Sequence, residues 1–287
     1  MNKNKNLIIQ ETFNLAVKNH QEGKTDIAQE LYNQVLKIDP NHSQTLNNIA
    51  VIFTNLKEYQ KAKSCYEKAI EINPNYADAL NNLGAIFKEL KDYQKRKDCY
   101  EKVIVINPNN ADAHYNLGNT FKELKEYQKA KSCYEKAIVI NPNNADALNN
   151  LGVIFLELKE YQKAKSCYEK AIEINPNYAD ALNNLGVVFL ELREYQKAKI
   201  FFEKVIEIKP DHADAHNNLG TIFKELKEYQ KAKGCYEKAL EINPLNKEYM
   251  VTYGNILLVL NDKFKGYEYI KKGQGVIKFT PSYCKII

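Results

Sequence analysis

Seven prolines recur at a fixed spacing and set the organisation of the chain. They stand 34 residues apart, without an insertion, at Pro40, Pro74, Pro108, Pro142, Pro176, Pro210 and Pro244. The sequence around them copies itself, as "KAKSCYEKAIVINPNNADALNNLG" and "KAKSCYEKAIEINPNYADALNNLG" show in two successive copies. A fixed period of about 20–50 residues indicates a stacked array in which each unit contacts mainly its neighbours.

The period divides the chain into seven full repeats and one decayed copy. The full repeats are predicted at 9–42, 43–76, 77–110, 111–144, 145–178, 179–212 and 213–246. A short polar extension, 1–8, precedes them. A degenerate eighth repeat at 247–280 and a tail at 281–287 follow.

Each repeat predicts two helices. In the third repeat, Leu80, Leu83 and Phe87 recur at spacings of three and four, which forms one apolar stripe on a first helix. A short turn at 91–92 separates it from a second helix, which ends before Pro108 because proline cannot continue a helix. A helix pair of this size cannot bury its own apolar stripe, so neighbouring pairs are expected to stack.

The residues at fixed positions resemble the tetratricopeptide repeat. That pattern has leucine and glycine in the first helix, as in "LNNLG", then an aromatic residue, a small alanine, a second aromatic residue and the proline. In the fifth repeat these positions are Leu151, Gly152, Phe155, Ala164, Tyr168 and Pro176. The resemblance implies an all-α fold: a right-handed α-α superhelix, or solenoid, of about seven helix pairs with a degenerate C-terminal capping repeat.

Polar residues recur on the face of each first helix opposite the apolar stripe. The second, sixth, ninth and thirteenth residues of a repeat share this face because they are spaced by three or four. In the family, the first helices line a concave surface, so the resemblance implies that this face looks into a groove. The sixth position holds Asn14, Asn48, Asn82, Asn116, Asn150, Asn184 and Asn218. The second position holds Asp78, Asp112, Asp146, Asp180 and Asp214.

A row of asparagine amides suits the main chain of a partner, because each amide offers both donors and an acceptor. The arrangement resembles the superhelical arm of protein O-GlcNAc transferases, in which an asparagine ladder holds substrate polypeptide. The sequence therefore predicts a non-catalytic scaffold or adaptor that binds an extended polypeptide along the groove. The alternative is the substrate-recognition arm of an O-GlcNAc-transferase-like system that acts with a partner chain.

Structural explanations for the same residues remain open. The aspartates stand in the first helical turn, where the helix dipole favours a carboxylate. The asparagines could bond across repeats and stiffen the stack, and the preceding asparagines, such as Asn149 and Asn183, could be structural.

Charge and composition limit the classes of partner that the chain can bind. The net charge is only +5 and acids alternate with bases, which argues against nucleic acid. No apolar run is long enough for a signal peptide or a membrane span, so we expect a cytoplasmic protein without membrane contact. The groove has Asp and Glu where chaperone-tail receptors of the family use cations. It should therefore bind neutral, hydroxyl-rich or basic segments and not acidic chaperone C-termini.

Catalysis and metal binding find no support in the sequence. No nucleophile–base pair, glycine-rich phosphate loop or metal-spaced cluster stands out, so no enzyme activity, cofactor or metal is predicted. Five cysteines share one position in their repeats, at spacings of roughly 10 Å that exceed the ~7 Å limit for a disulfide. We expect half-buried, reduced thiols at Cys65, Cys99, Cys133, Cys167 and Cys235.

Several residues depart from the pattern. Arg96 replaces a small alanine and should snorkel or push the helices apart, whereas His114 and His216 replace a leucine and are expected to pack in the core. Lysines stand where the family prefers glycine in the turn, which predicts slightly strained turns. We expect the apolar tail to cap the last repeat, although docking into a groove or pairing between chains is an alternative.

Overall fold

The computed structural model describes residues 2–274, 277–279 and 284–286. It divides the chain into two compact units, residues 1–142 and 143–287. The first unit contains α1 (Asn2–Gln21), α2 (Thr25–Ile38), α3 (Ser43–Asn55), α4 (Tyr59–Ile72), α5 (Ala77–Glu89), α6 (Tyr93–Ile106), α7 (Ala111–Glu123) and α8 (Tyr127–Ile140). The second contains α9 (Ala145–Glu157), α10 (Tyr161–Ile174), α11 (Ala179–Glu191), α12 (Tyr195–Ile208), α13 (Ala213–Glu225), α14 (Tyr229–Ile242), α15 (Lys247–Val259), α16 (Lys263–Gln274), β1 (Ile277–Phe279) and β2 (Cys284–Ile286).

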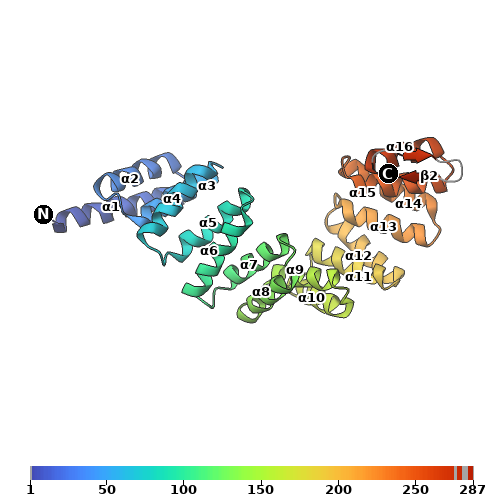
Figure 1. Cartoon of the computed structure of the whole chain (residues 1–287), viewed down its shortest axis with the longest axis horizontal. Helices are drawn as coiled ribbons and strands as arrows, with labels where there is room; N and C mark the ends of the chain where they lie inside the picture. Colours follow the sequence, from blue (N-terminus) through green and yellow to red (C-terminus); the bar gives the residue numbers. More distant parts are fainter. Residues whose placement is uncertain (1, 275–276, 280–283, 287) are drawn as a thin grey trace. The chain divides into compact units, whose positions relative to one another are not determined.

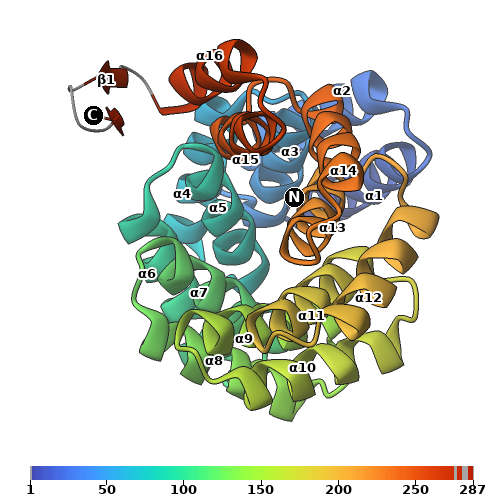
Figure 2. The same ribbon diagram turned by 90° about the vertical axis from the view of Figure 1, so that its right-hand side faces the viewer.

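Both units are stacks of helix pairs, as predicted. Within each unit, every first helix packs on the second helix of its own repeat, and that second helix packs on the first helix of the next repeat in the unit (Figure 1). First helices of successive repeats also touch directly, as α3 touches α5 and α9 touches α11. Figure 2 shows α11 and α13 on one side of the second unit and α10 and α12 on the other. We call the surface that the first helices form in each unit its inner surface.

The turns between paired helices are strained at the predicted lysines. The chain leaves each first helix through a residue with positive φ, where side chains are disfavoured. These residues are Lys57, Lys91, Lys125, Lys159 and Lys227, with φ between 56° and 60°, together with Arg193 and Asn261. Only the turn after α1 uses glycine among the described residues, at Gly23 with φ 75°.

An aromatic ring packed on a glycine joins the two helices of the third to seventh repeats. In the fifth repeat Tyr168 is fully buried, and a Cβ added to Gly152 would lie 2.5 Å from its Cε1 atom. The same contact recurs between Gly118 and Tyr134, and between Gly186 and Phe202. No larger residue fits at these glycines without displacing a ring that is buried on all sides.

Replacing Gly152 with alanine should therefore destabilise the fold. Overpacking typically costs about 1–3 kcal/mol, which exceeds the ~1 kcal/mol gain in helix propensity. Gly234 in α14 is the matched control, because a Cβ there would meet nothing within 4 Å. Thermal unfolding should show a lower midpoint for Gly152→Ala and a higher one for Gly234→Ala. Equal shifts for the two variants would contradict the packing argument.

The buried tyrosine hydroxyls find different partners in different repeats. Tyr134 donates a hydrogen bond to Asn119 Oδ1 at 2.8 Å, and Tyr236 lies 3.2 Å from the Thr221 hydroxyl. The hydroxyl of Tyr168 is buried without a partner, and its burial raises the pKa of this tyrosine. Asn119 and Thr221 stand at the ninth position of their repeats. In the repeat of Tyr168 this position is Val153, whose side chain has no hydrogen-bond acceptor.

The two tyrosines should respond differently to loss of the hydroxyl. Tyr134→Phe removes a buried hydrogen bond and should cost about 1 kcal/mol. Tyr168→Phe removes an unsatisfied buried group, so it should leave stability unchanged or raise it. Urea unfolding of both variants against the unmodified chain measures the difference. A larger loss for Tyr168→Phe would show that its hydroxyl has a partner in solution.

The residues that depart from the repeat pattern are accommodated by burial. Arg96 does not snorkel: it is only 3 % exposed, and its guanidinium carbon lies 5.8 Å from the centre of the Tyr100 ring. His114 is buried as predicted, with Nε2 3.0 Å from the Pro108 carbonyl oxygen. His216 makes the same contact to the preceding turn but is only half-buried.

Both ends of the array differ from a regular repeat. Helix α1 begins at Asn2, so residues of the predicted extension 1–8 belong to it. Helices α15 and α16 form the eighth helix pair. The sequence did not predict the antiparallel pairing of β1 with β2, in which Ile277 lies opposite Ile286. Residues 275–276, 280–283 and 287 lie outside the described part, so the capping and self-association roles of the tail stay predictions.

Candidate functional site

The asparagines at the sixth position lie on the inner surfaces of the two units. They are half-buried at Asn48, Asn82, Asn116, Asn150, Asn184 and Asn218. Asn14 on α1 is exposed and accepts a hydrogen bond from Gln10 at 2.9 Å. Half-burial leaves part of each amide in contact with solvent. We call these six half-buried residues the asparagine ladder.

Members of the ladder donate hydrogen bonds to the preceding repeat. Asn184 Nδ2 donates to Asn149 Oδ1 at 3.0 Å, and Asn218 Nδ2 donates to Asn183 Oδ1 at 3.3 Å. Asn82 makes the same bond to Asn47 at 3.4 Å in the first unit. The cross-repeat bonding that the sequence left open therefore exists, and one amide N–H of each of these three residues is used in it.

Asn48 and Asn116 do not donate to the preceding repeat in this way. The repeat before Asn48 has Phe13 at the acceptor position, and Asn48 donates instead to the Tyr32 hydroxyl at 3.1 Å. At Asn116 the expected acceptor is Asn81 Oδ1, which is buried and has no hydrogen-bond partner. The hydrogen bonds of the ladder therefore vary more between repeats than the sequence does, since the two asparagines recur almost unchanged.

The first asparagine of each pair has a different environment from the second. Asn47, Asn149, Asn183 and Asn217 are all buried. Asn217 Oδ1 also accepts a hydrogen bond from the Thr252 hydroxyl of the next repeat, at 2.8 Å. The side-chain oxygens of these residues are buried acceptors of hydrogen bonds between repeats, so their role is structural.

The aspartates of the second position are exposed in the first turn of α5, α7, α9, α11 and α13. They are Asp78, Asp112, Asp146, Asp180 and Asp214. Three of them also receive a contact from a residue at the end of the same repeat or near the start of the next one. Tyr178 donates to Asp146 Oδ1 at 2.5 Å, Tyr249 donates to Asp214, and His212 Nε2 lies 3.6 Å from Asp180 Oδ1. The hydrogen bond from His212 lowers the pKa of Asp180, which keeps this carboxylate ionised.

Sequence reasoning missed the residues that contact these aspartates. Tyr178 and His212 both stand immediately before a first helix, where Asn144 caps the helix by accepting from the Ala147 N–H at 2.8 Å. Variation between asparagine, histidine and tyrosine at this position was the available signal. Tyr178 and His212 each contact the aspartate at the start of their own repeat.

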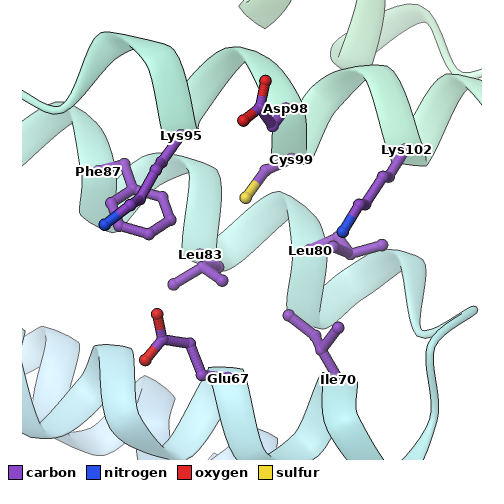
Figure 3. Close-up of a pocket in the computed structure, with 9 residues that line it drawn as sticks. All are labelled: Glu67, Ile70, Leu80, Leu83, Phe87, Lys95, Asp98, Cys99 and Lys102. Carbon is purple, nitrogen blue, oxygen red and sulfur yellow. The ribbon is translucent and has the colours of Figure 1, made fainter.

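A second surface, away from the inner one, carries the cysteines. A pocket of about 270 Å³ lies between α4, α5 and α6, and Figure 3 shows the side chains that line it. Leu80, Leu83 and Cys99 lie at its floor, with Lys95 and Asp98 nearby. In the sixth repeat Phe201 replaces the cysteine and stacks on Phe189 with ring centres 5.5 Å apart. Cys99 is smaller than the ring that fills this position in the sixth repeat.

The thiols of Cys99, Cys133 and Cys235 are protonated near neutral pH. Burial raises the pKa of Cys99 to about 12 and those of Cys133 and Cys235 to about 11. A thiol with so high a pKa carries almost no thiolate near neutral pH, and the thiolate is the reactive form. Within the described residues, no group of three His, Cys, Asp or Glu side chains could hold a metal ion. None of the described helices is both long and apolar enough to cross a membrane.

Comparison with known families agrees with the geometry. The tetratricopeptide repeat family matches at 13–42, 43–76, 65–97, 111–144, 145–178, 167–200 and 213–246. The chain therefore belongs to the tetratricopeptide repeat family. Repeats of this family typically form non-catalytic scaffolds for protein–protein interaction, and this chain has the fold of such a scaffold.

Solved structures of other repeat proteins are similar. YrrB, described as a TPR protein with an unusual peptide-binding site, is 26% identical over 64% of this chain and 95% of its own, with a TM-score of 0.56. PilF of Pseudomonas aeruginosa is 25% identical over 67% of this chain and 88% of its own, with a TM-score of 0.60. A repeat protein from Parabacteroides merdae, 17% identical, covers 93% of this chain and 99% of its own at a TM-score of 0.66, which shows the fold alone. No curated protein matches the chain.

The cysteines should resist alkylation in the folded chain. A buffer at pH 8 is roughly three or more pH units below the pKa values of Cys99, Cys133 and Cys235. Only about a thousandth or less of each thiol is therefore ionised to thiolate. Iodoacetamide should label them slowly in native buffer and quickly in urea, as read by peptide mass spectrometry. Fast labelling of Cys99 in the native chain would show that it is accessible and activated.

Proposed function

We infer that this chain is a non-catalytic scaffold that holds an extended segment of a partner polypeptide along its inner surface. The asparagine ladder is the proposed contact with the partner's main chain. The observation that carries the proposal is the unequal environment of the paired asparagines. In the second, fifth, sixth and seventh repeats the first asparagine is buried and its Oδ1 accepts a hydrogen bond from the next repeat, whereas the second asparagine is half-buried. The third repeat departs from this pattern, because Asn81 is half-buried and its Oδ1 has no partner.

The chemistry of the amide supports a role beyond stacking. An asparagine amide has two N–H donors and a carbonyl acceptor, and the bond to the preceding repeat uses one donor. Asn184 and Asn218 each keep a carbonyl oxygen and a second N–H in addition to that bond. These two groups match the alternating C=O and N–H groups of an extended chain.

The aspartates support a preference for neutral or basic segments. All five are exposed at the second position, and Asp180 is held ionised by His212. Carboxylates along the inner surface repel an acidic peptide and attract lysine and arginine. We therefore extend the proposal to basic, neutral or hydroxyl-rich partners, and away from acidic chaperone C-termini. YrrB, as a TPR protein with a peptide-binding site, gives a precedent for peptide binding on a similar fold.

The test separates binding from stacking with two variants that break the same hydrogen bonds. One variant removes the donor residues and the other removes the acceptor residues. Asn184→Ala/Asn218→Ala removes the two donors of the ladder. Asn149→Ala/Asn183→Ala removes their two acceptors, which are buried and out of a ligand's reach. Both double variants lose the same cross-repeat bonds, so a purely structural ladder predicts equal effects.

We expect the first double variant to lose binding and the second to keep it. On an array of unstructured basic and neutral decapeptides, Asn184→Ala/Asn218→Ala should bind at least about tenfold more weakly, a loss of about 1.4 kcal/mol. Asn149→Ala/Asn183→Ala should remain within about twofold of the unmodified chain. An acidic peptide ending in EEVD serves as the negative control. Equal losses in the two double variants, or none in either, would reduce the ladder to a structural feature.

A further inference from the structure

The inner surface of the second unit is not uniform. Helices α9 and α11 contain no lysine or arginine, and their only charged residues are one aspartate near the start and one glutamate at the end. Helix α13 has the same aspartate and glutamate but also carries Lys224. The two adjacent helices α9 and α11 therefore differ in charge from their neighbour, although their sequences are otherwise close copies.

Apolar side chains occupy the middle of this acidic stretch. They are Val153 and Leu156 on α9, and Val187 and Leu190 on α11, and all four are half-buried. The ninth and twelfth positions of the repeat lie beside the asparagine ladder, since Val153 follows Asn150 by three residues. Because α9 and α11 contact each other directly, we treat the four residues as one apolar strip.

The fold itself does not require an apolar residue at these positions. Helix α13 has Thr221 and Lys224 in their place and packs in the same way against α14. In the first unit, Asn119 and Lys122 occupy the same positions on α7. The four apolar residues thus leave hydrocarbon partly exposed where α7 and α13 place polar side chains.

Carboxylates flank the strip at both ends of each helix. Asp146 and Asp180 precede it, and Glu157 and Glu191 follow it, and all four are exposed. The Asp180 side chain is 67% exposed and ionised. A partner that covers this surface must offer apolar side chains at its centre and positive charges around them.

We propose that α9 and α11 form a subsite for a polypeptide segment with apolar side chains flanked by lysine or arginine. This subsite rests on the proposed function, since the asparagine ladder beside the strip would hold the main chain of the same segment. Equivalent positions of adjacent repeats lie roughly 10 Å apart, by the usual distance between packed helices. In a polyproline II segment, side chains three residues apart point the same way at a spacing of about 9 Å. The partner therefore carries apolar residues at positions i and i+3.

The test uses a fluorescein-labelled decapeptide, KKSLSSLSKK, whose two leucines have this spacing. Its controls are KKSSSSSSKK, which lacks the leucines, and EESLSSLSEE, which reverses the charge. The protein variant Val153→Thr/Leu156→Lys/Val187→Thr/Leu190→Lys installs the residues of α13, which the fold already tolerates. The opposite variant, Thr221→Val/Lys224→Leu, extends the strip onto α13. Circular dichroism confirms that both variants are folded.

We expect fluorescence anisotropy to show that the fourfold variant binds KKSLSSLSKK at least about tenfold more weakly and the twofold variant more tightly. Binding should weaken as salt is raised, because part of it is electrostatic. Equal affinity of the unmodified chain for KKSLSSLSKK and KKSSSSSSKK would overturn the subsite and leave the proposed function intact. Preference for EESLSSLSEE would also overturn it. If the chain bound none of the three peptides while the asparagine variants still differed on the array, the subsite alone would fail.

Discussion

The contact between a buried aromatic ring and a bare glycine is the interaction on which the third to seventh repeats depend. It brings the two helices of a pair close enough that a Cβ at Gly152 would overlap the Tyr168 ring. Because the two helices are held together in this way, one face of the first helix packs in the core and the opposite face remains accessible. The same ring carries its hydroxyl toward the ninth position, where Asn119 and Thr221 accept or share its hydrogen bond. Packing in the core thus decides which residues of the first helix remain for contact with a partner.

Local features of the sequence were enough to predict the helices. The turn predicted at 91–92 separates α5, which ends at Glu89, from α6, which begins at Tyr93. Positive φ at Lys91 was also predictable, because the repeat pattern places glycine there. Contacts between repeats were not predictable, because they depend on how side chains from separate helices meet. The bonds from Asn184 to Asn149 and from Asn218 to Asn183 belong to this class. The burial of Arg96, the bond from Tyr178 to Asp146 and the pairing of β1 with β2 also escaped prediction.

The paired asparagines show how a residue that is unfavourable in helices can be retained. Asparagine costs about 0.5 kcal/mol or more relative to alanine in a helix interior. A buried hydrogen bond contributes about 1 kcal/mol, so one bond between Asn184 and Asn149 roughly offsets the cost of both residues. Stacking therefore explains why the pair is tolerated. It does not explain why Asn184 stays half-exposed, since a buried residue would serve the stack equally well.

Contacts to a main chain and contacts to side chains give a repeat protein different properties. Amides that bind backbone groups accept any sequence, so a ladder by itself provides affinity that grows with the length of the bound segment. Selectivity needs positions that differ from one repeat to the next. Along the inner surface of the second unit, the ninth and twelfth positions change from Val153 and Leu156 to Thr221 and Lys224, whereas the ladder asparagines stay the same. On the proposed function, the near-identical repeats would hold the partner's backbone, and the few positions that vary would determine which partner binds.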